Sequence, residues 1–224
     1  GYGEDGEDSH RTAFDVLAWW ARSGLMDIVR PSENSSPGFV PIGIGDQPSG
    51  VALFASIMTA LYRREKTGKG GEVYTSLMAN GAWSNGSYIQ AGLFDAEFPD
   101  RRDESPLHPF GGRYKTKDGR FLLLAIIDAA KEWPKFLEAM NLEYLNKNEK
   151  FSNFKNLNIN FKELYKILED VFIQIDLSDA IDKLKNSGVT FGFMNKSEDL
   201  AEDKQFLDSG VLIKYEDQAF GDDT

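Results

Sequence analysis

The longest helical segment of the chain constrains its fold most, because sequence signals mark both of its ends. An apolar run begins after Pro48, and proline suits a first helical turn, where its missing N–H costs nothing. The run ends in Lys66, Thr67 and Gly68. Lys66 is a cation near the negative end of the helix dipole, and Gly68 can take the left-handed conformation with which the chain leaves a helix. The sequence therefore predicts a helix from about Pro48 to Lys66.

The segments around this helix predict an alternation of helices and a strand. Residues 13–26 carry apolar side chains at helical spacing, and Gly24 offers a stop. Val73, Thr75 and Leu77 alternate as in a strand, after which the chain passes into another helix. This order of helix, helix, strand and helix is typical of an α/β layer.

A second lobe is predicted beyond a charged, proline-punctuated stretch. We interpret residues 94–112 as a linker between a domain over residues 1–93 and a smaller α+β domain over residues 113–224. A hairpin turning at Asp118 and Gly119 opens the second domain. Asp128 then caps a helix in which Pro134 is tolerated only in the first turn. Amphipathic helices follow over residues 161–175 and 177–188.

Composition excludes several classes of function. The formal net charge of -11 argues against nucleic acid as a partner, because phosphate binding needs a basic face. The chain has no Cys and only two His, so thiol catalysis is excluded, and a zinc site or a Ser-His-Asp triad is disfavoured. No apolar run reaches membrane length and no signal peptide is visible, so we expect no membrane association and a cytoplasmic location.

One carboxylate, Asp46, stands in the turn-rich stretch GIGDQPSG directly before the long helix. The simpler interpretation is that Asp46 is the helix N-cap. The alternative is that Gly43, Gly45 and Gly50 clear space so that a substrate can approach the acid. These residues alone leave both interpretations open.

Four stretches, in one order, give the chain a family resemblance. They are GYGEDGED, AFDVLAWWARSGLM, GIGDQPSGVALFASIMTALYRREKTGKG and YKTKDGRFLLLAI. Together they resemble the family III CoA-transferases, the group of formyl-CoA transferase, carnitine CoA-transferase and α-methylacyl-CoA racemase. The resemblance implies part of a Rossmann-like large domain plus a smaller domain, in an interlocked homodimer. Family members are longer, so it also implies that an N-terminal third and a C-terminal tail are missing here.

The resemblance gives Asp46 a role in catalysis. It places Asp46 on the family's nucleophilic aspartate, which attacks an acyl-CoA and passes CoA to a small carboxylic acid. A helix N-terminus would favour the negative charge of Asp46 and would supply N–H donors for the charge that develops during the reaction. CoA is then a substrate, with no permanently bound cofactor and no metal. Asp15 matches an acid near the active site of the resembling enzymes, and we predict it as a second catalytic residue.

The same resemblance implies a binding site for CoA. Gly111 and Gly112 match a glycine-rich loop that covers the reacting aspartate, and Arg113 can hold an acceptor carboxylate or a CoA phosphate. With Gly45, these residues form the predicted CoA-binding set. An alternative function is an acyl-CoA racemase, but Phe14 occupies the position of that enzyme's catalytic His and cannot transfer a proton. A further alternative is a truncated, non-catalytic fragment that acts as an interaction domain.

Overall fold

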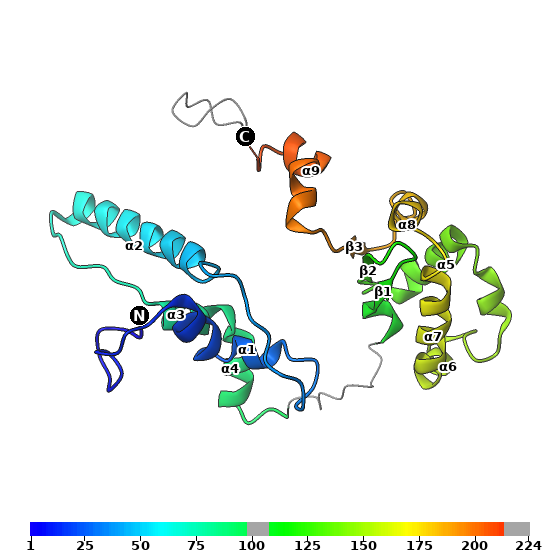
Figure 1. Ribbon diagram of the computed structural model, residues 1–224, viewed down its shortest axis with the longest axis horizontal. Helices are drawn as coiled ribbons and strands as arrows, with labels where there is room; N and C mark the ends of the chain where they lie inside the picture. The colour runs from blue at the N-terminus through cyan, green and yellow to red at the C-terminus, as the bar shows by residue number, and fades with distance from the viewer. Residues whose placement is uncertain (98–107, 213–224) are drawn as a thin grey trace. The chain divides into compact units, whose positions relative to one another are not determined.

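The computed structural model describes residues 1–97 and 108–212, and its chain divides into two compact units, Gly1–Ser105 and Pro106–Thr224 (Figure 1). Each unit is described by itself. Most of the predicted linker over residues 94–112 lies outside the described residues, and the predicted domain boundaries stay a prediction. The described chain mixes helices with one sheet, and none of its helices is long and apolar enough to cross a membrane.

Within its described residues, the first unit consists of helices joined by long loops, with no strand. Its elements are a π-helix η1 (Val16–Ala21), α1 (Leu25–Ile28), α2 (Asp46–Thr67), α3 (Leu77–Ser84) and α4 (Gly86–Leu93). The helix predicted over residues 13–26 is divided between η1 and α1, because Gly24 takes a φ of 86° and ends the first segment. Helix α3 packs against η1, and the two approach so closely that a Cβ on Gly81 would lie 2.4 Å from the carbonyl oxygen of Trp19.

The long helix α2 is confirmed, and it starts two residues before Pro48. Gly68 ends it with a φ of 70°, and its N–H donates to the carbonyl of Arg64, as a C-terminal glycine should. Ser49 is the only buried residue of this 22-residue helix within the described structure. Val51, Phe54 and Tyr62 are each more than 60% exposed, so much of the apolar surface of α2 faces solvent.

The strand predicted around residues 73–77 is wrong. No strand occurs anywhere in residues 1–97, so the α/β alternation predicted for this lobe is absent from its described part. The Ser76 hydroxyl accepts a hydrogen bond from the N–H of Ala79 at 3.0 Å and caps α3, which draws Leu77 into a helix. Alternating side chains form a strand only where a neighbouring strand can pair with them.

The second unit contains a three-stranded antiparallel sheet in the order β1-β2-β3. Its strands are β1 (Arg113–Lys115), β2 (Phe121–Leu124) and β3 (Phe191–Phe193). The predicted hairpin between β1 and β2 is confirmed, with Tyr114 opposite Leu122 and Gly119 at a φ of 78° in the turn. β3 returns from far along the chain, and Gly192 lies opposite Leu123.

Helices cover this sheet and close a hydrophobic core. They are η2 (Pro109–Gly111), α5 (Ala129–Met140), η3 (Glu143–Lys147), α6 (Phe154–Ile159), α7 (Phe161–Phe172) and α8 (Leu177–Leu184). Two short helices, η4 (Ser197–Ala201) and α9 (Lys204–Asp208), follow β3 and contribute no residue to this core. The predicted cap is confirmed, because the Asp128 carboxylate accepts the N–H of Lys131 at 3.3 Å. Pro134 was expected in the first turn, but it lies in the second turn of α5. The two predicted amphipathic helices are confirmed as α7 and α8.

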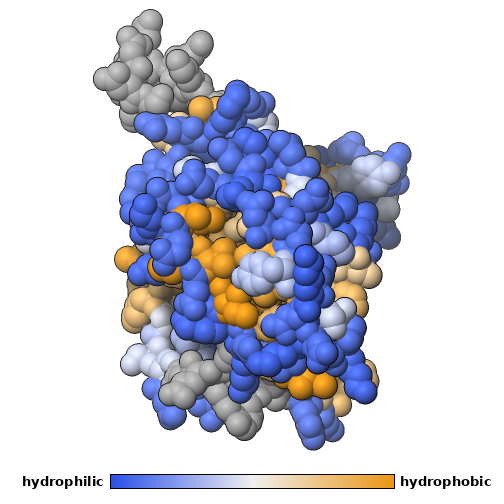
Figure 2. All heavy atoms as spheres, turned by 90° about the vertical axis from the view of Figure 1, so that its right-hand side faces the viewer, coloured by the Kyte–Doolittle hydropathy of each residue, from blue (hydrophilic) through white to orange (hydrophobic). Residues whose placement is uncertain are grey.

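Buried apolar side chains are distributed unequally between the units. The second unit has a continuous core that includes Leu122, Phe136, Leu164 and Phe172, each fully buried. In residues 1–97, by contrast, the buried hydrophobic side chains are Tyr2, Ala18, Trp20 and Leu25. Figure 2 shows that polar side chains frame a patch of hydrophobic ones on the face of the second unit.

A buried carboxylate connects a helix to the sheet in the second unit. Glu132 of α5 is 7% exposed, and its oxygens accept the N–H of Thr190 at 2.6 Å and the N–H of Asp128 at 3.2 Å. The hydrogen bond from Thr190, which stands directly before β3, holds the pKa of Glu132 below its ordinary value, against the opposing effect of burial. Glu132 therefore fixes the start of β3 against α5.

We predict that Glu132→Gln lowers the free energy of unfolding at pH 7 by about 1.5–3 kcal/mol, because it removes charge-assisted hydrogen bonds. Because the pKa of Glu132 is lowered in the folded protein, its ionised form stabilises the fold. This stabilisation is fully present above the ordinary glutamate pKa of about 4.3 and is lost as the pH falls below that value. The difference between wild type and variant in urea unfolding should therefore shrink below about pH 4. Glu138→Gln, on the exposed face of the same helix, is the control and should change little.

We also predict that residues 106–224 fold alone, because the continuous core lies within them. The separate segment should show one cooperative thermal transition, followed by the fluorescence of Trp133, which is 4% exposed. Residues 1–105, with few buried apolar side chains, should lack such a transition when followed by their own tryptophans. A sharp transition of residues 1–105 alone would contradict this interpretation.

Candidate active site

Asp46 is the first residue of α2 and is exposed to solvent. Gly45 occupies the N-cap position, so the interpretation of Asp46 as the N-cap is wrong. Within the described part of the chain, the Asp46 side chain has no hydrogen-bond or ion-pair partner. Its oxygens stand at the positive end of the helix dipole and are open to another molecule.

The backbone N–H groups at the start of α2 are already engaged. Those of Asp46 and Gln47 both donate to the carbonyl of Gly43 at 3.1 Å, and that of Ser49 donates to the carbonyl of Gly45 at 3.3 Å. Pro48 has no N–H. The sequence led us to expect free donors here for developing negative charge, and this expectation is wrong for the structure as it stands. The helix dipole remains the favourable electrostatic feature beside Asp46.

Asp15 is buried against the loop of residues 43–45, which precedes Asp46. Its side chain is 2% exposed, and its Oδ2 accepts the N–H of Gly43 at 2.8 Å and the N–H of Gly45 at 3.1 Å. Its Oδ1 accepts the N–H of Val16 at 2.8 Å, at the start of η1. The structure therefore brings both predicted acids to one loop, but both oxygens of Asp15 are directed at backbone amides.

The glycines of this loop serve different purposes. Gly43 takes a φ of 93°, which favours glycine, so it forms the turn. Gly45 is buried against Trp19, and a Cβ added to Gly45 would lie 2.6 Å from Cγ of the indole. A Cβ on Gly43 or Gly50 would meet nothing within 4 Å, in contrast to Gly45, so close packing rather than substrate clearance explains Gly45. A contact of Gly45 with CoA stays a prediction.

Phe14 directly precedes Asp15 in the sequence, and Trp19 follows Asp15 by four residues. Trp19 is packed against another residue, whereas Phe14 is exposed to solvent. Trp19 packs on Gly45 from within η1, a contact that the sequence did not predict because the two residues lie far apart in the chain. A π-helix places side chains at unusual angles and is frequent at functional sites, but no sequence pattern predicted one here. Phe14 is 64% exposed and offers no group that could transfer a proton.

The other predicted CoA-binding residues belong to the second unit. Gly111 ends η2 and Arg113 begins β1, and Arg113 is exposed with no side-chain ion pair among the described residues. Gly112 is buried, and a Cβ there would meet the ring of Tyr114. These three residues and Asp46 belong to different units, each described by itself, so the predicted covering loop stays a prediction.

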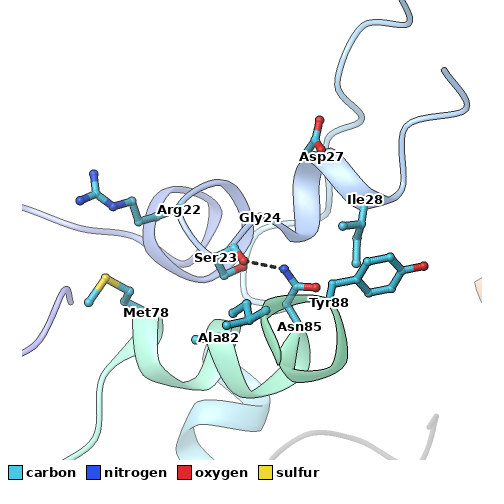
Figure 3. A pocket seen from close by; sticks show the side chains of 10 residues that line it. Arg22, Ser23, Gly24, Asp27, Ile28, Met78, Ala82, Asn85 and Tyr88 are labelled. Atoms are coloured by element: carbon cyan, nitrogen blue, oxygen red, sulfur yellow. Dashed lines mark hydrogen bonds between the residues drawn. The ribbon is translucent and has the colours of Figure 1, made fainter. Parts of the chain in front are cut away.

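A hollow of about 610 Å³ lies elsewhere in the first unit, between α1, α3 and α4 (Figure 3). The Asn85 side chain, 6% exposed, donates from Nδ2 to the carbonyl of Ser23 at 2.8 Å. Its buried Oδ1 has no partner in the part of the chain that the structure describes. Sequence reasoning did not identify this hollow, since Asn85 carries no motif, and the hollow does not include Asp46.

Within residues 1–97 and 108–212, no group of three or more His, Cys, Asp or Glu side chains could hold a metal ion. Two carboxylates and several backbone amides lie at the loop before α2. One exposed, unpaired carboxylate stands beside one buried carboxylate that binds backbone.

Comparison with known proteins gives a consistent result. The model of the family described as CoA-transferase family III matches residues 1–223. The (R)-2-hydroxy-4-methylpentanoate CoA-transferase of Clostridioides difficile is 31% identical over 96% of this chain and 53% of its own length. The cinnamoyl-CoA:phenyllactate CoA-transferase of Clostridium sporogenes is also 31% identical, over 96% of this chain and 52% of its own length. The chain thus spans about half the length of these relatives.

Solved structures share the fold. A CAIB/BAIF family protein from Brucella suis superposes with a TM-score of 0.79 at 23% identity, over 96% of this chain and 56% of that one. At this identity the likeness supports the fold alone.

We predict that Gly45→Ala lowers the free energy of unfolding by about 1–3 kcal/mol, because the added methyl group overlaps the Trp19 indole. Gly50→Ala is the matched control within α2. It meets nothing and should raise stability by about 0.5–1 kcal/mol through the helix propensity of alanine. Urea unfolding of the complete gene product measures both, and equal effects would contradict the packing of Trp19 on Gly45.

Proposed function

The chain belongs to CoA-transferase family III, and from this premise we propose that it moves CoA between an acyl-CoA thioester and a free carboxylic acid through a covalent intermediate on Asp46. The single observation that carries the proposal is the state of Asp46. It is an exposed carboxylate without a partner among the described residues, at the start of a long helix, on a loop held by another acid.

These features suit a nucleophile. A carboxylate is a weak nucleophile, and hydrogen bonds or ion pairs to its oxygens weaken it further, so a carboxylate without such partners is the more reactive one. The backbone that carries Asp46 is fixed by the hydrogen bonds of the loop, which restricts the side chain to a few directions. Covalent catalysis then divides one difficult exchange into easier steps.

The proposed reaction is a series of balanced exchanges. An Asp46 oxygen attacks the thioester carbonyl, the C–S bond breaks, and CoA leaves as its thiolate while a mixed anhydride forms on Asp46. The thiolate attacks the Asp46 carbonyl of that anhydride, so the donor acid leaves and an aspartyl-CoA thioester forms. The acceptor carboxylate displaces CoA in the same way, and the thiolate then attacks the acceptor's carbonyl. New acyl-CoA and free Asp46 result, with no redox step and no metal required.

Each step places negative charge on a carbonyl oxygen, and the source of its stabilisation has to lie outside the first turn of α2. The backbone N–H groups of that turn already donate to the carbonyls of Gly43 and Gly45. The proposal keeps the segment of Gly111 and Gly112 as a covering loop, with Arg113 as the cation for a phosphate or a carboxylate. The N–H groups of both glycines already donate to the carbonyls of His108 and Pro109. The proposal therefore assigns the stabilisation to the charge of Arg113 rather than to these amides. One lost donor of this type raises the barrier by about 3–4 kcal/mol.

The two relatives above suggest the substrate class. Their names specify 2-hydroxy-4-methylpentanoate and phenyllactate, which are both 2-hydroxy acids. We therefore extend the proposal to a 2-hydroxy carboxylic acid as the partner of CoA exchange. The proposal also includes a cytoplasmic, threaded homodimer in which residues 1–93 belong to the large CoA-binding domain and residues 113–224 form the small domain.

The test is Asp46→Ala in the complete gene product. We expect transfer of CoA to a 2-hydroxy acid to fall to background, together with hydroxylamine trapping of the enzyme-bound acyl or CoA adduct, because both need the Asp46 oxygen. Asp5→Ala, which removes an exposed acid from the same unit, should leave both unchanged. Near wild-type transfer by Asp46→Ala would end the proposal.

Two further outcomes identify the alternatives. Deuterium exchange at the α-carbon of an acyl-CoA, without any acceptor acid, would indicate a racemase, against which Phe14 argues. No thermal stabilisation by millimolar CoA would indicate a non-catalytic fragment, since a bound ligand stabilises by RT ln(1 + [L]/Kd).

A further inference from the structure

The geometry points to Asp15 as a positioning residue that sets the direction of the Asp46 side chain through the backbone of Gly43 and Gly45. This inference rests on the proposed function, because it assumes that Asp46 is the nucleophile. It replaces the direct catalytic role that the sequence predicted for Asp15.

The connection runs through a short, continuous series of hydrogen bonds. Oδ2 of Asp15 accepts the N–H of Gly43 at 2.8 Å, and the carbonyl of Gly43 accepts the N–H of Asp46 at 3.1 Å. The same Oδ2 accepts the N–H of Gly45, the residue that precedes Asp46, at 3.1 Å. The position of one oxygen atom thus fixes the backbone on the N-terminal side of Asp46 at two points.

The other oxygen anchors this arrangement. Oδ1 of Asp15 accepts the N–H of Val16 at 2.8 Å, which orients the carboxylate at the start of η1. One turn further along η1, Trp19 packs against Gly45 with no room for a side chain between them. The loop is therefore held by a carboxylate and by an indole, both from the same short helix.

Asp15 makes no ion pair among the residues that the structure describes, so amide hydrogen bonds are what compensate its burial. With three N–H donors on its two oxygens, it has little capacity left for a substrate. Asp46, in contrast, has no side-chain partner within residues 1–97 and 108–212, so there only its backbone limits where its oxygens point. A change at Asp15 should therefore act on the reactivity of Asp46 more than on substrate binding.

Asp15→Asn tests this inference with the least change of shape. An amide has a single acceptor oxygen, so its NH₂ group must face an N–H that Asp15 now binds. We expect kcat per titrated active site to fall about 10- to 100-fold, the size of effect that a displacement of about 1 Å produces. KM for acyl-CoA should change less than about threefold, because binding contacts are kept. The rate of hydroxylamine trapping should fall in parallel with kcat.

Controls separate positioning from loss of folding. Asp5→Asn removes an exposed carboxylate of the same unit and should leave kcat unchanged. Gly45→Ala displaces the loop from the Trp19 side while Asp15 remains, and it should lower kcat in the same way. If Asp15→Asn yields no folded protein, the test is made with Gly45→Ala. A lowered kcat with little change of KM would support control of Asp46 through the loop, and an unchanged kcat would contradict it.

The outcomes are distinguishable from those of the proposed function. Unchanged kcat per active site in Asp15→Asn, with Asp46→Ala inactive, would overturn the positioning role and leave the nucleophile in place. A rise of KM without a fall of kcat would also overturn it, since it would make Asp15 a determinant of binding. Transfer retained by Asp46→Ala would instead show that the proposed function has failed.

Discussion

The hydrogen bonds of one buried carboxylate determine the geometry of the candidate site. Asp15 accepts amides from Gly43 and Gly45 on one side and from Val16 on the other. Burial of a carboxylate is unfavourable without such partners, so the loop and the acid require each other. An open loop would leave Oδ2 of Asp15 without donors, and an apolar side chain would leave the amides of Gly43 and Gly45 without an acceptor. This mutual requirement orders a glycine-rich turn, together with the packing of Trp19 on Gly45.

The second unit uses the same device in a different setting. Glu132 joins α5 to the start of β3 through the amide of Thr190, and its other oxygen accepts the amide of Asp128 at the N-cap of its own helix. This unit also has a continuous apolar core. The first unit has few buried apolar side chains, and its long helix α2 is largely exposed. Polar contacts therefore account for a larger share of what positions the site than of what holds the second unit together.

The sequence predicted features that depend on neighbouring residues and missed those that depend on distant ones. Helix α2, the hairpin at Gly119 and the cap by Asp128 follow from local signals, and all are confirmed. The strand near Val73 failed because pairing is not a local property, and Pro134 was misplaced because tertiary packing tolerates it beyond the first turn. The link from Asp15 to Gly43 spans 28 residues, and nothing in either segment alone specifies it.

The two acids of the site divide between them two requirements that one side chain cannot meet. A nucleophilic carboxylate needs a fixed position, yet hydrogen bonds that fix its oxygens also make them less reactive. Here Asp15 has both oxygens engaged by backbone amides, while Asp46 has neither engaged within the described chain. The hydrogen bonds of Gly43 and Gly45 fix the backbone of Asp46. The Asp46 oxygens stay available at the N-terminal end of the helix, where negative charge is favoured. In the proposed function, the separation of these roles is what would allow an acid that is exposed and unpaired among the described residues to be both fixed in position and reactive.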